Sequence, residues 1–283
     1  MNTMSMTNLK KFNPIGLFLI CYFILYYDTI LGLIEDWNAN DNYSHGFLVP
    51  FITVYFIWNM KDQLSNISIK PENNGLFFLI GSLIFFIITN IGAEFFTMRF
   101  TMILVLLSGI YYLLGIDFMR QLFLPVSYLI FMIPFPAIIW NKIAFPLKIF
   151  ATSIAVSVIK FINIPVYSEG NIIHLANTTL EVVDACSGLR SLVSLLALSA
   201  AFALITKNTR IRNVILFLSA IPIAIILNIF RLTMTAVLAI KFGPDTAKGF
   251  LHDASGFVVF IMAFLLLMMV NNALSQSERK QEN

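Results

Sequence analysis

The sequence alternates between long apolar runs and short polar stretches, and this pattern predicts a bundle of membrane-spanning helices. A run of about 20 mostly apolar residues is long enough for an α-helix to cross a bilayer. The polar stretches between the runs are short loops. We expect about eight spans, at residues 14–34, 46–60, 75–92, 100–116, 122–140, 187–206, 213–240 and 252–270.

The composition supports the same class. The chain has 283 residues, of which 59% are hydrophobic and 12% charged, whereas an ordinary soluble domain is about one quarter charged. The net charge of +3 is small and the basic residues lie in short loops, so nucleic acid is not an expected partner. We therefore predict an all-α membrane protein with one multi-pass domain over residues 1–283, surrounded by membrane lipids.

Positive charges predict the orientation, because Lys and Arg are concentrated in loops on the cytoplasmic side of a membrane. The N-terminal tail 1–13, the KNTRIR loop at 207–212 and the C-terminal tail 271–283 all carry such residues and are expected inside. Residues 165–185 and 241–251 are then expected outside.

Residues 143–164 are predicted to form a helix that lies in the outer interface without crossing. They are apolar enough to span, but five polar residues fall on one broad face, namely Lys148, Thr152, Ser153, Ser157 and Lys160. Such a face is typical of an interfacial helix, and omitting this crossing places both basic segments inside. The lysines of this region are then outside, against the positive-inside rule, so a crossing helix stays open as the alternative.

Two short alternating runs follow the interfacial segment and predict an extracytoplasmic hairpin. NIIHL (171–175) and TLEVV (179–183) are rich in β-branched residues and are separated by Ala176, Asn177 and Thr178. Such runs around a turn-forming residue are typical of paired strands.

The stretch LEVVDACSGLRSL (180–192) places Cys186 where a polar loop enters a membrane helix. The first backbone N–H groups of a helix lack internal partners and carry the positive end of its dipole. A thiol there is expected to lose its proton more readily, and the thiolate is the nucleophile. Arg190, four residues on, adds positive charge on the same face. A lone membrane cysteine is more often a small buried apolar residue.

Arg231 and His252 are predicted to reach the same membrane face as Cys186. Arg231 is 18 residues beyond Asn213, which corresponds to about 27 Å of helix, close to the thickness of the hydrocarbon core. His252 begins the last span from the outside. Cysteine and histidine can act as nucleophile and base in acyl transfer, and arginine can stabilise a thiolate or an oxyanion.

Each of these residues has a simpler interpretation. Arg231 could reach lipid headgroups, and His45 or His174 could replace His252 as the base. A metal site of Cys186, His252 and Asp253 matches no zinc spacing, so no metal is predicted. Acidic residues in the first span and the outer turn could instead belong to a transport pathway, namely Asp28 and Glu94.

Four blocks of the chain resemble the exosortase/archaeosortase family. They are NYSHGFLVP (42–50), ACSGLRSL (185–192), NIFRL (228–232) and HDASGFVVF (252–260), and the resemblance covers about residues 40 to 270. Members of this family are multi-pass cysteine transpeptidases of the prokaryotic cell membrane. Some members carry a further C-terminal extracytoplasmic domain, which leaves the subtype open.

The resemblance implies a function and a role for each site residue. The expected substrates are secreted proteins that end in a short motif, a membrane helix and a basic cluster. Cleavage of this sorting signal outside the cytoplasm is linked in many bacteria to exopolysaccharide. Cys186 is then the nucleophile, Arg231 the electrostatic partner and His252 the acid/base, and no cofactor is implied.

Two other functions remain open from the sequence. One is a non-enzymatic transporter or assembly factor for envelope polysaccharide, in which the outer polar residues line a pathway. The other is an acyltransferase that uses a histidine and does not need the thiol. One hyper-reactive cysteine at position 186 would distinguish the thiol enzyme from both.

Overall fold

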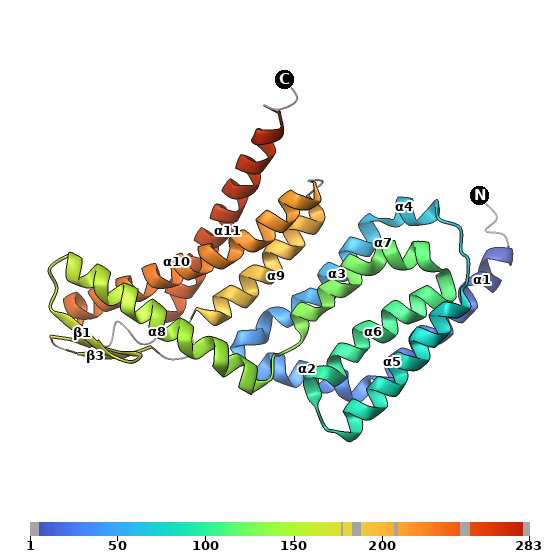
Figure 1. The fold of residues 1–283 in the computed structure, drawn as a ribbon, viewed down its shortest axis with the longest axis horizontal. Coiled ribbons are helices and arrows are strands. Elements are labelled where there is room, and N and C mark those ends of the chain that lie inside the picture. Colours follow the sequence, from blue (N-terminus) through green and yellow to red (C-terminus); the bar gives the residue numbers. More distant parts are fainter. Residues whose placement is uncertain (1–5, 177, 183–187, 207–208, 244–249, 280–283) are drawn as a thin grey trace. The chain divides into compact units, whose positions relative to one another are not determined.

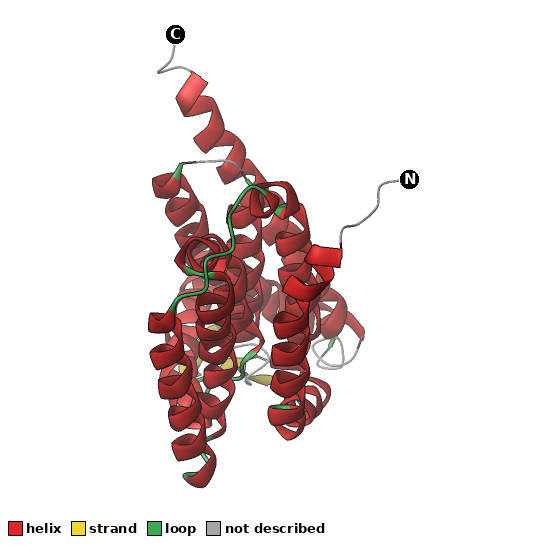
Figure 2. Cartoon of the chain, turned by 90° about the vertical axis from the view of Figure 1, so that its right-hand side faces the viewer, coloured by secondary structure: helices red, strands yellow, loops and turns green. Residues whose placement is uncertain are grey.

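A computed structural model describes the backbone of residues 6–176, 178–182, 188–206, 209–243 and 250–279, and the side chains of the same ranges except 6–13, 250–255 and 276–279. The described residues are mostly helical (Figure 2). They pack into two compact units, residues 1–134 and 135–283. Each unit is described by itself.

The described residues of the first unit form helices joined by short loops. Its elements are α1 (Met6–Leu25), α2 (Tyr27–Ala39), the 3₁₀ helix η1 (Asp41–Phe47), α3 (Leu48–Asn59), α4 (Lys61–Ser65), α5 (Asn73–Ile91), α6 (Phe95–Leu114), α7 (Ile116–Ser127) and the 3₁₀ helix η2 (Tyr128–Met132) (Figure 1).

Several polar contacts tie α6 to the N-terminal helices of this unit, including a 3.3 Å hydrogen bond from the Tyr22 hydroxyl to the Met102 carbonyl. The hydroxyl groups of Tyr26 and Thr101 lie 2.9 Å apart at fully buried positions. At the end of α2, Asp36 Oδ2 is 2.6 Å from Nη1 of Arg99, which is buried in the first turns of α6. Burying a guanidinium is costly unless a charge partner is provided, so this ion pair accounts for an arginine in an apolar helix.

The second unit combines four helices with a small sheet. Its elements are α8 (Ala137–Phe161), β1 (Val166–Glu169), β2 (Ile172–Leu175), β3 (Thr179–Glu181), α9 (Leu189–Ile205), α10 (Arg210–Phe242) and α11 (Phe250–Arg279). The long helix α10 packs against α8, α9 and α11, and α8 packs on the sheet (Figure 1). The helix α10 is therefore the central element of this unit.

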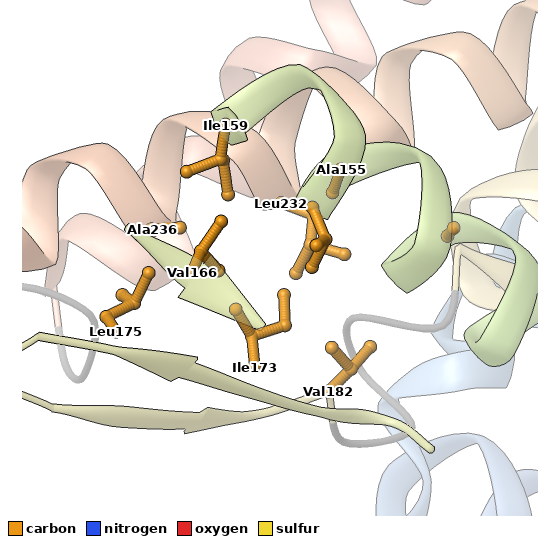
Figure 3. Close-up of a cluster of buried hydrophobic side chains, with 10 residues drawn as sticks. Ala155, Ile159, Val166, Ile173, Leu175, Val182, Leu232 and Ala236 are labelled. Atoms are coloured by element: carbon orange, nitrogen blue, oxygen red, sulfur yellow. The ribbon is translucent and has the colours of Figure 1, made fainter. Parts of the chain in front are cut away.

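The sheet has the strand order β1-β2-β3, and both pairs are antiparallel. Ile173 pairs with Ser168 on one side and Leu180 on the other. One face contributes Val166, Ile173, Leu175 and Val182 to a buried cluster with residues of α8 and α10 (Figure 3). The cluster members from α10 are Leu232 and Ala236.

The helices confirm the helical membrane class, although they do not confirm eight separate spans. Five described helices are long and apolar enough to cross a membrane, or six if the bent pair α1 and α2 is one span. The expected spans 75–92 and 100–116 correspond to α5 and α6. The segment 143–164 lies largely within α8. This helix is also long and apolar enough to cross a membrane, so its length and composition are compatible with the crossing alternative.

Three expected spans differ in detail. Residues 14–34 are bent by 61° between α1 and α2, and the span 46–60 is replaced by η1 and the 12-residue α3. The span 122–140 is wrong as a continuous helix, because α7 ends at Ser127 and α8 begins only at Ala137. Pro134 and Pro136 lie in this gap, and proline removes a backbone donor and disfavours helix for the preceding residue.

Candidate active site

The approach to the site begins with Gly188, which caps the N-terminus of α9 in a left-handed conformation with φ of 79°. A β-carbon added here would lie 2.7 Å from both Cγ and Nδ2 of Asn228 on α10. Glycine avoids the steric cost of positive φ and permits this close approach. The start of α9 is thus held against α10 at Asn228.

The other end of the Cys186 segment joins a buried cluster that includes residues of α8 and α10. Val182, which directly follows β3, is 1% exposed and belongs to the same buried cluster as Leu232 (Figure 3). Cys186 itself lies in residues 183–187, outside the described residues. Of its two described flanks, Gly188 lies against Asn228, and Val182 shares a buried cluster with Leu232. Asn228 and Leu232 are four residues apart on α10, which is about one turn of helix.

Arg231 lies between Asn228 and Leu232 in the sequence of α10. It is 8% exposed and is three residues beyond Asn228, so the two residues are neighbours on the helix surface. The continuous apolar run through Ile240 predicts a long helix, and α10 extends unbroken past this point from Arg210 to Phe242. A buried ionisable residue in a membrane bundle is a functional candidate by default.

His252 is placed by its backbone in the first turn of α11, and its side chain lies outside the described residues. The body of α11 is fixed against α9 and α10 by a second buried cluster, in which Val259, Ala263 and Leu267 are the members from α11. The structure therefore gives the helix that carries His252 but not the direction of its imidazole.

The two competing histidines have other surroundings. His174 is on the sheet face opposite the buried cluster, because its neighbours Ile173 and Leu175 are buried in that cluster. Its ring stacks on Tyr167 with centroids 4.5 Å apart, and its Nε2 is 3.7 Å from Glu169 Oε2. His45 belongs to the first unit, where its Nε2 is 3.1 Å from the Phe131 carbonyl oxygen. A carbonyl only accepts, so this nitrogen carries the proton.

The acidic residues considered for a transport pathway divide into two cases. Glu94 is the N-cap of α6 and accepts a hydrogen bond of 2.6 Å from the Thr97 backbone N–H. Hydrogen bonding to the Thr97 side chain, and then to backbone N–H groups, lowers the pKa of Glu94. A structural role thus explains Glu94, whereas Asp28 is simply exposed in α2.

Within the described part of the chain, a small cavity accompanies these residues and no metal-binding cluster does. No three described His, Cys, Asp or Glu side chains are placed to share a metal ion. A cavity of about 10 Å³ adjoins the contact between Gly188 and Asn228, and this volume is roughly that of one water-sized sphere. It is lined by Leu147, Phe150, Ala151, Gly188, Leu192, Ala224, Ile225 and Asn228.

Comparison with known protein families identifies a match over most of the chain. Residues 37–269 match the model of the transmembrane exosortase family, and the match includes all three predicted site residues. The chain belongs to the transmembrane exosortase family. No curated protein and no solved structure shows significant similarity to it. Membership of this family, together with the long apolar helices, identifies the chain as a membrane protein.

Sequence reasoning missed two features of this exosortase site. Asn228 was read only as part of the NIFRL block, although it is 4% exposed and meets the backbone of Gly188. A buried amide three residues before a buried arginine, on an otherwise apolar helix, is the signal that could have identified it. The third strand, β1, was also missed, and it completes the sheet that precedes Cys186.

Proposed function

We propose that this exosortase-family chain is a membrane-embedded thiol transpeptidase or peptidase. It cleaves the C-terminal sorting signal of secreted proteins at the outer face of the cell membrane and transfers them onward. The observation that carries the proposal is the position of Arg231 on α10, between Asn228 and Leu232. Asn228 lies against Gly188, and Leu232 shares a buried cluster with Val182, so these residues are linked to the two flanks of the Cys186 segment.

The proposed reaction starts with transfer of the Cys186 thiol proton to His252. The sulfur then bonds to the carbonyl carbon beside the membrane helix of the substrate, and Arg231 stabilises the negative charge on the oxygen. The C–N bond breaks, His252 returns the proton to the leaving amine, and a thioester remains. Attack by an amine gives a new amide, whereas attack by water gives a carboxylate, and either step releases the thiol.

The burial of Arg231 supports its electrostatic role. A guanidinium keeps its proton in an apolar environment, whereas an ammonium readily loses it. Charge interactions are also stronger away from water. A buried arginine one turn from the anchor of the Cys186 segment can therefore act on a developing oxyanion with little screening.

The decisive experiment compares the two cysteines. A secreted protein of the host that ends in a short motif, one membrane helix and a basic cluster is produced together with wild-type or variant enzyme, and loss of its C-terminal signal is followed. Cys186→Ala and Cys186→Ser should abolish processing, because neither side chain provides a thiolate at neutral pH. Cys21→Ala is the matched control and should process normally, since Cys21 lies within α1.

Membrane insertion must be equal in all variants for this comparison to count. Normal maturation of the substrate by Cys186→Ala would overturn the thiol mechanism. The polysaccharide transporter or scaffold interpretation would then take its place.

A further inference from the structure

The sheet before the Cys186 segment has one packed face and one open face. Val166, Ile173, Leu175 and Val182 are buried on the packed face. Side chains alternate along a strand, so the intervening residues share the opposite face. These include Tyr167, Glu169, Thr179 and Glu181, all exposed, together with the half-buried His174. The half-buried Ile172 also lies on this open face, which is therefore mostly polar and carries two carboxylates.

The hydrogen-bond pattern shows which backbone groups of β3 point away from β2. The N–H of Val182 donates to Asn171 O at 2.8 Å, and the N–H of Leu175 donates to Thr178 O at 2.9 Å. Hydrogen-bonded and non-bonded pairs alternate along an antiparallel ladder, so the backbone N–H and C=O groups of Thr178, Leu180 and Val182 point toward β2. The N–H and C=O groups of Thr179 and Glu181 consequently point to the outer edge.

The sequence of β3 contains neither Pro nor Lys, although the strand is short and carries one charged residue, Glu181. Natural edge strands are usually blunted by Pro, Lys, a bulge or a covering element. The strand β3 reads Thr-Leu-Glu, and within the described residues β2 is its strand neighbour. An edge of this kind matches the backbone of an extended peptide, which adds to a sheet as a further strand.

The charge of the open face restricts the side chains that such a peptide can carry. Glu169, Ile172 and Glu181 form one row across the three strands, because Ile172 pairs with both glutamates. A residue added opposite Glu181 extends this row, and like charges directly opposite are destabilising whereas opposite charges attract. A basic residue is thus favoured there and an acidic one is disfavoured.

We propose that the outer edge of β3 binds an extended segment of the substrate polypeptide as a fourth strand, with a basic residue opposite Glu181. This inference rests on the proposed function, since it supplies the binding site for the same substrate. Cys186 is five residues beyond Glu181 in the chain, which spans at most about 17 Å. A peptide held on β3 is therefore held within reach of the thiol.

Proline substitutions test the edge directly. Glu181→Pro and Thr179→Pro each remove an outward N–H but no backbone hydrogen bond to β2, and proline is tolerated in edge strands at such positions. Thr179→Pro also removes the 3.5 Å contact between Thr179 Oγ1 and His174 Nδ1, so Glu181→Pro is the cleaner variant. Ser168→Pro is the matched control. Ser168 lies in β1 and pairs with Ile173 of β2, and its N–H points outward at the opposite edge of the sheet. Processing of the tailed host protein should fall at least 10-fold in the β3 variants and stay near wild type in Ser168→Pro.

A binding measurement separates this proposal from the catalytic one. In a Cys186→Ala background, a photo-crosslinker at Thr179 should capture the tailed host protein, and one at Ser168 should not. Crosslinking at Thr179 with normal processing by Cys186→Ala would overturn the thiol mechanism while keeping the edge as a binding site. Equal processing by wild type and both β3 proline variants, at equal thermal stability, would overturn the edge proposal.

Charge exchange gives a second, independent test. The host protein is prepared with either Lys or Glu at successive positions ahead of its membrane helix. One position should favour Lys with the wild-type enzyme, and Glu181→Lys should reverse that preference. A uniform response at every position in both enzymes would contradict pairing with Glu181.

Discussion

The side-chain amide of Asn228 lies against the backbone of Gly188, so close that an added β-carbon would come within 2.7 Å of it. This contact joins the middle of α10 to the first residue before α9. It fixes one end of the segment that carries Cys186, and Arg231 follows three residues later. The relationship links two sequence blocks that are 40 residues apart.

Gly188→Ala should impair the enzyme through this contact. A left-handed conformation costs a non-glycine residue about 1–2 kcal/mol, and the new methyl group would also displace Asn228. We expect processing to fall at least 10-fold while the protein still inserts. The rate of Cys186 alkylation, measured in a Cys21→Ala background, should change as well. Gly81→Ala, with no atom within 4 Å of the added carbon, is the control.

The double variant Gly188→Ala with Asn228→Ala distinguishes the two effects. It removes the clash but keeps the backbone strain, so processing should recover in part. A Gly188→Ala enzyme with unchanged processing and unchanged thiol reactivity would show that the contact does not position the segment.

Arg231→Lys should be severely impaired although it keeps a positive charge in water. The buried position favours loss of the ammonium proton, and lysine lacks the planar fork of donors. We expect a loss of about 100-fold in processing, comparable to removal of one oxyanion donor. Arg210→Lys, at an exposed position on the same helix, should be neutral. Near-normal activity of Arg231→Lys would make Arg231 a structural or lipid-anchoring residue.

Periodicity and apolar length predicted part of this fold well. The alternation in NIIHL and TLEVV predicted the pairing of β2 with β3, and the apolar runs predicted α5, α6 and α9 within a few residues. The last expected span, 252–270, lies inside α11, which continues to Arg279. The strand β1 was missed because VYSE has only one buried residue, Val166. Its pairing depends on β2 and not on a pattern of its own.

The break around Pro134 shows a different limit. Residues 128–133 are apolar, and apolar character alone does not separate a continuous helix from the short 3₁₀ helix η2. Likewise, no local signal states that Asn228 meets Gly188, since that contact depends on how α9 crosses α10. The candidate site residues could be chosen from the chemistry of their side chains. Their spatial neighbours could be identified only from the packing of the helices.

Membrane orientation is open to a direct labelling test. We predict that residues 207–212 and the tail 271–283 are cytoplasmic and that 165–185 and 241–251 are outside. In a variant without native cysteines, an impermeant thiol reagent added to intact cells should label a cysteine at Ser168 and not one at Arg210. Labelling at Arg210 from outside would reverse the topology and would separate Cys186 from the outer face.

His45 gives a prediction about stability and pH. It connects η1 to η2 through its hydrogen bond to the Phe131 carbonyl, beside the bond from Trp37 Nε1 to Met132 O at 2.8 Å. Burial lowers the pKa of His45 below its usual value of 6.5, although backbone hydrogen bonds to Phe131 and Asn42 oppose this in part. The unfolded chain therefore binds more protons than the folded one just below that pH.

Stability should consequently be complete above about pH 6.5 and should fall as the pH drops through the lower pKa of the folded state. His45→Gln keeps a donor for Phe131 but cannot titrate, so its thermal midpoint in detergent should lose this dependence between pH 8 and pH 5. If His45→Gln and wild type lose the same stability on acidification, His45 is not the titrating group, and the buried link between η1 and η2 does not set the acid sensitivity of the first unit.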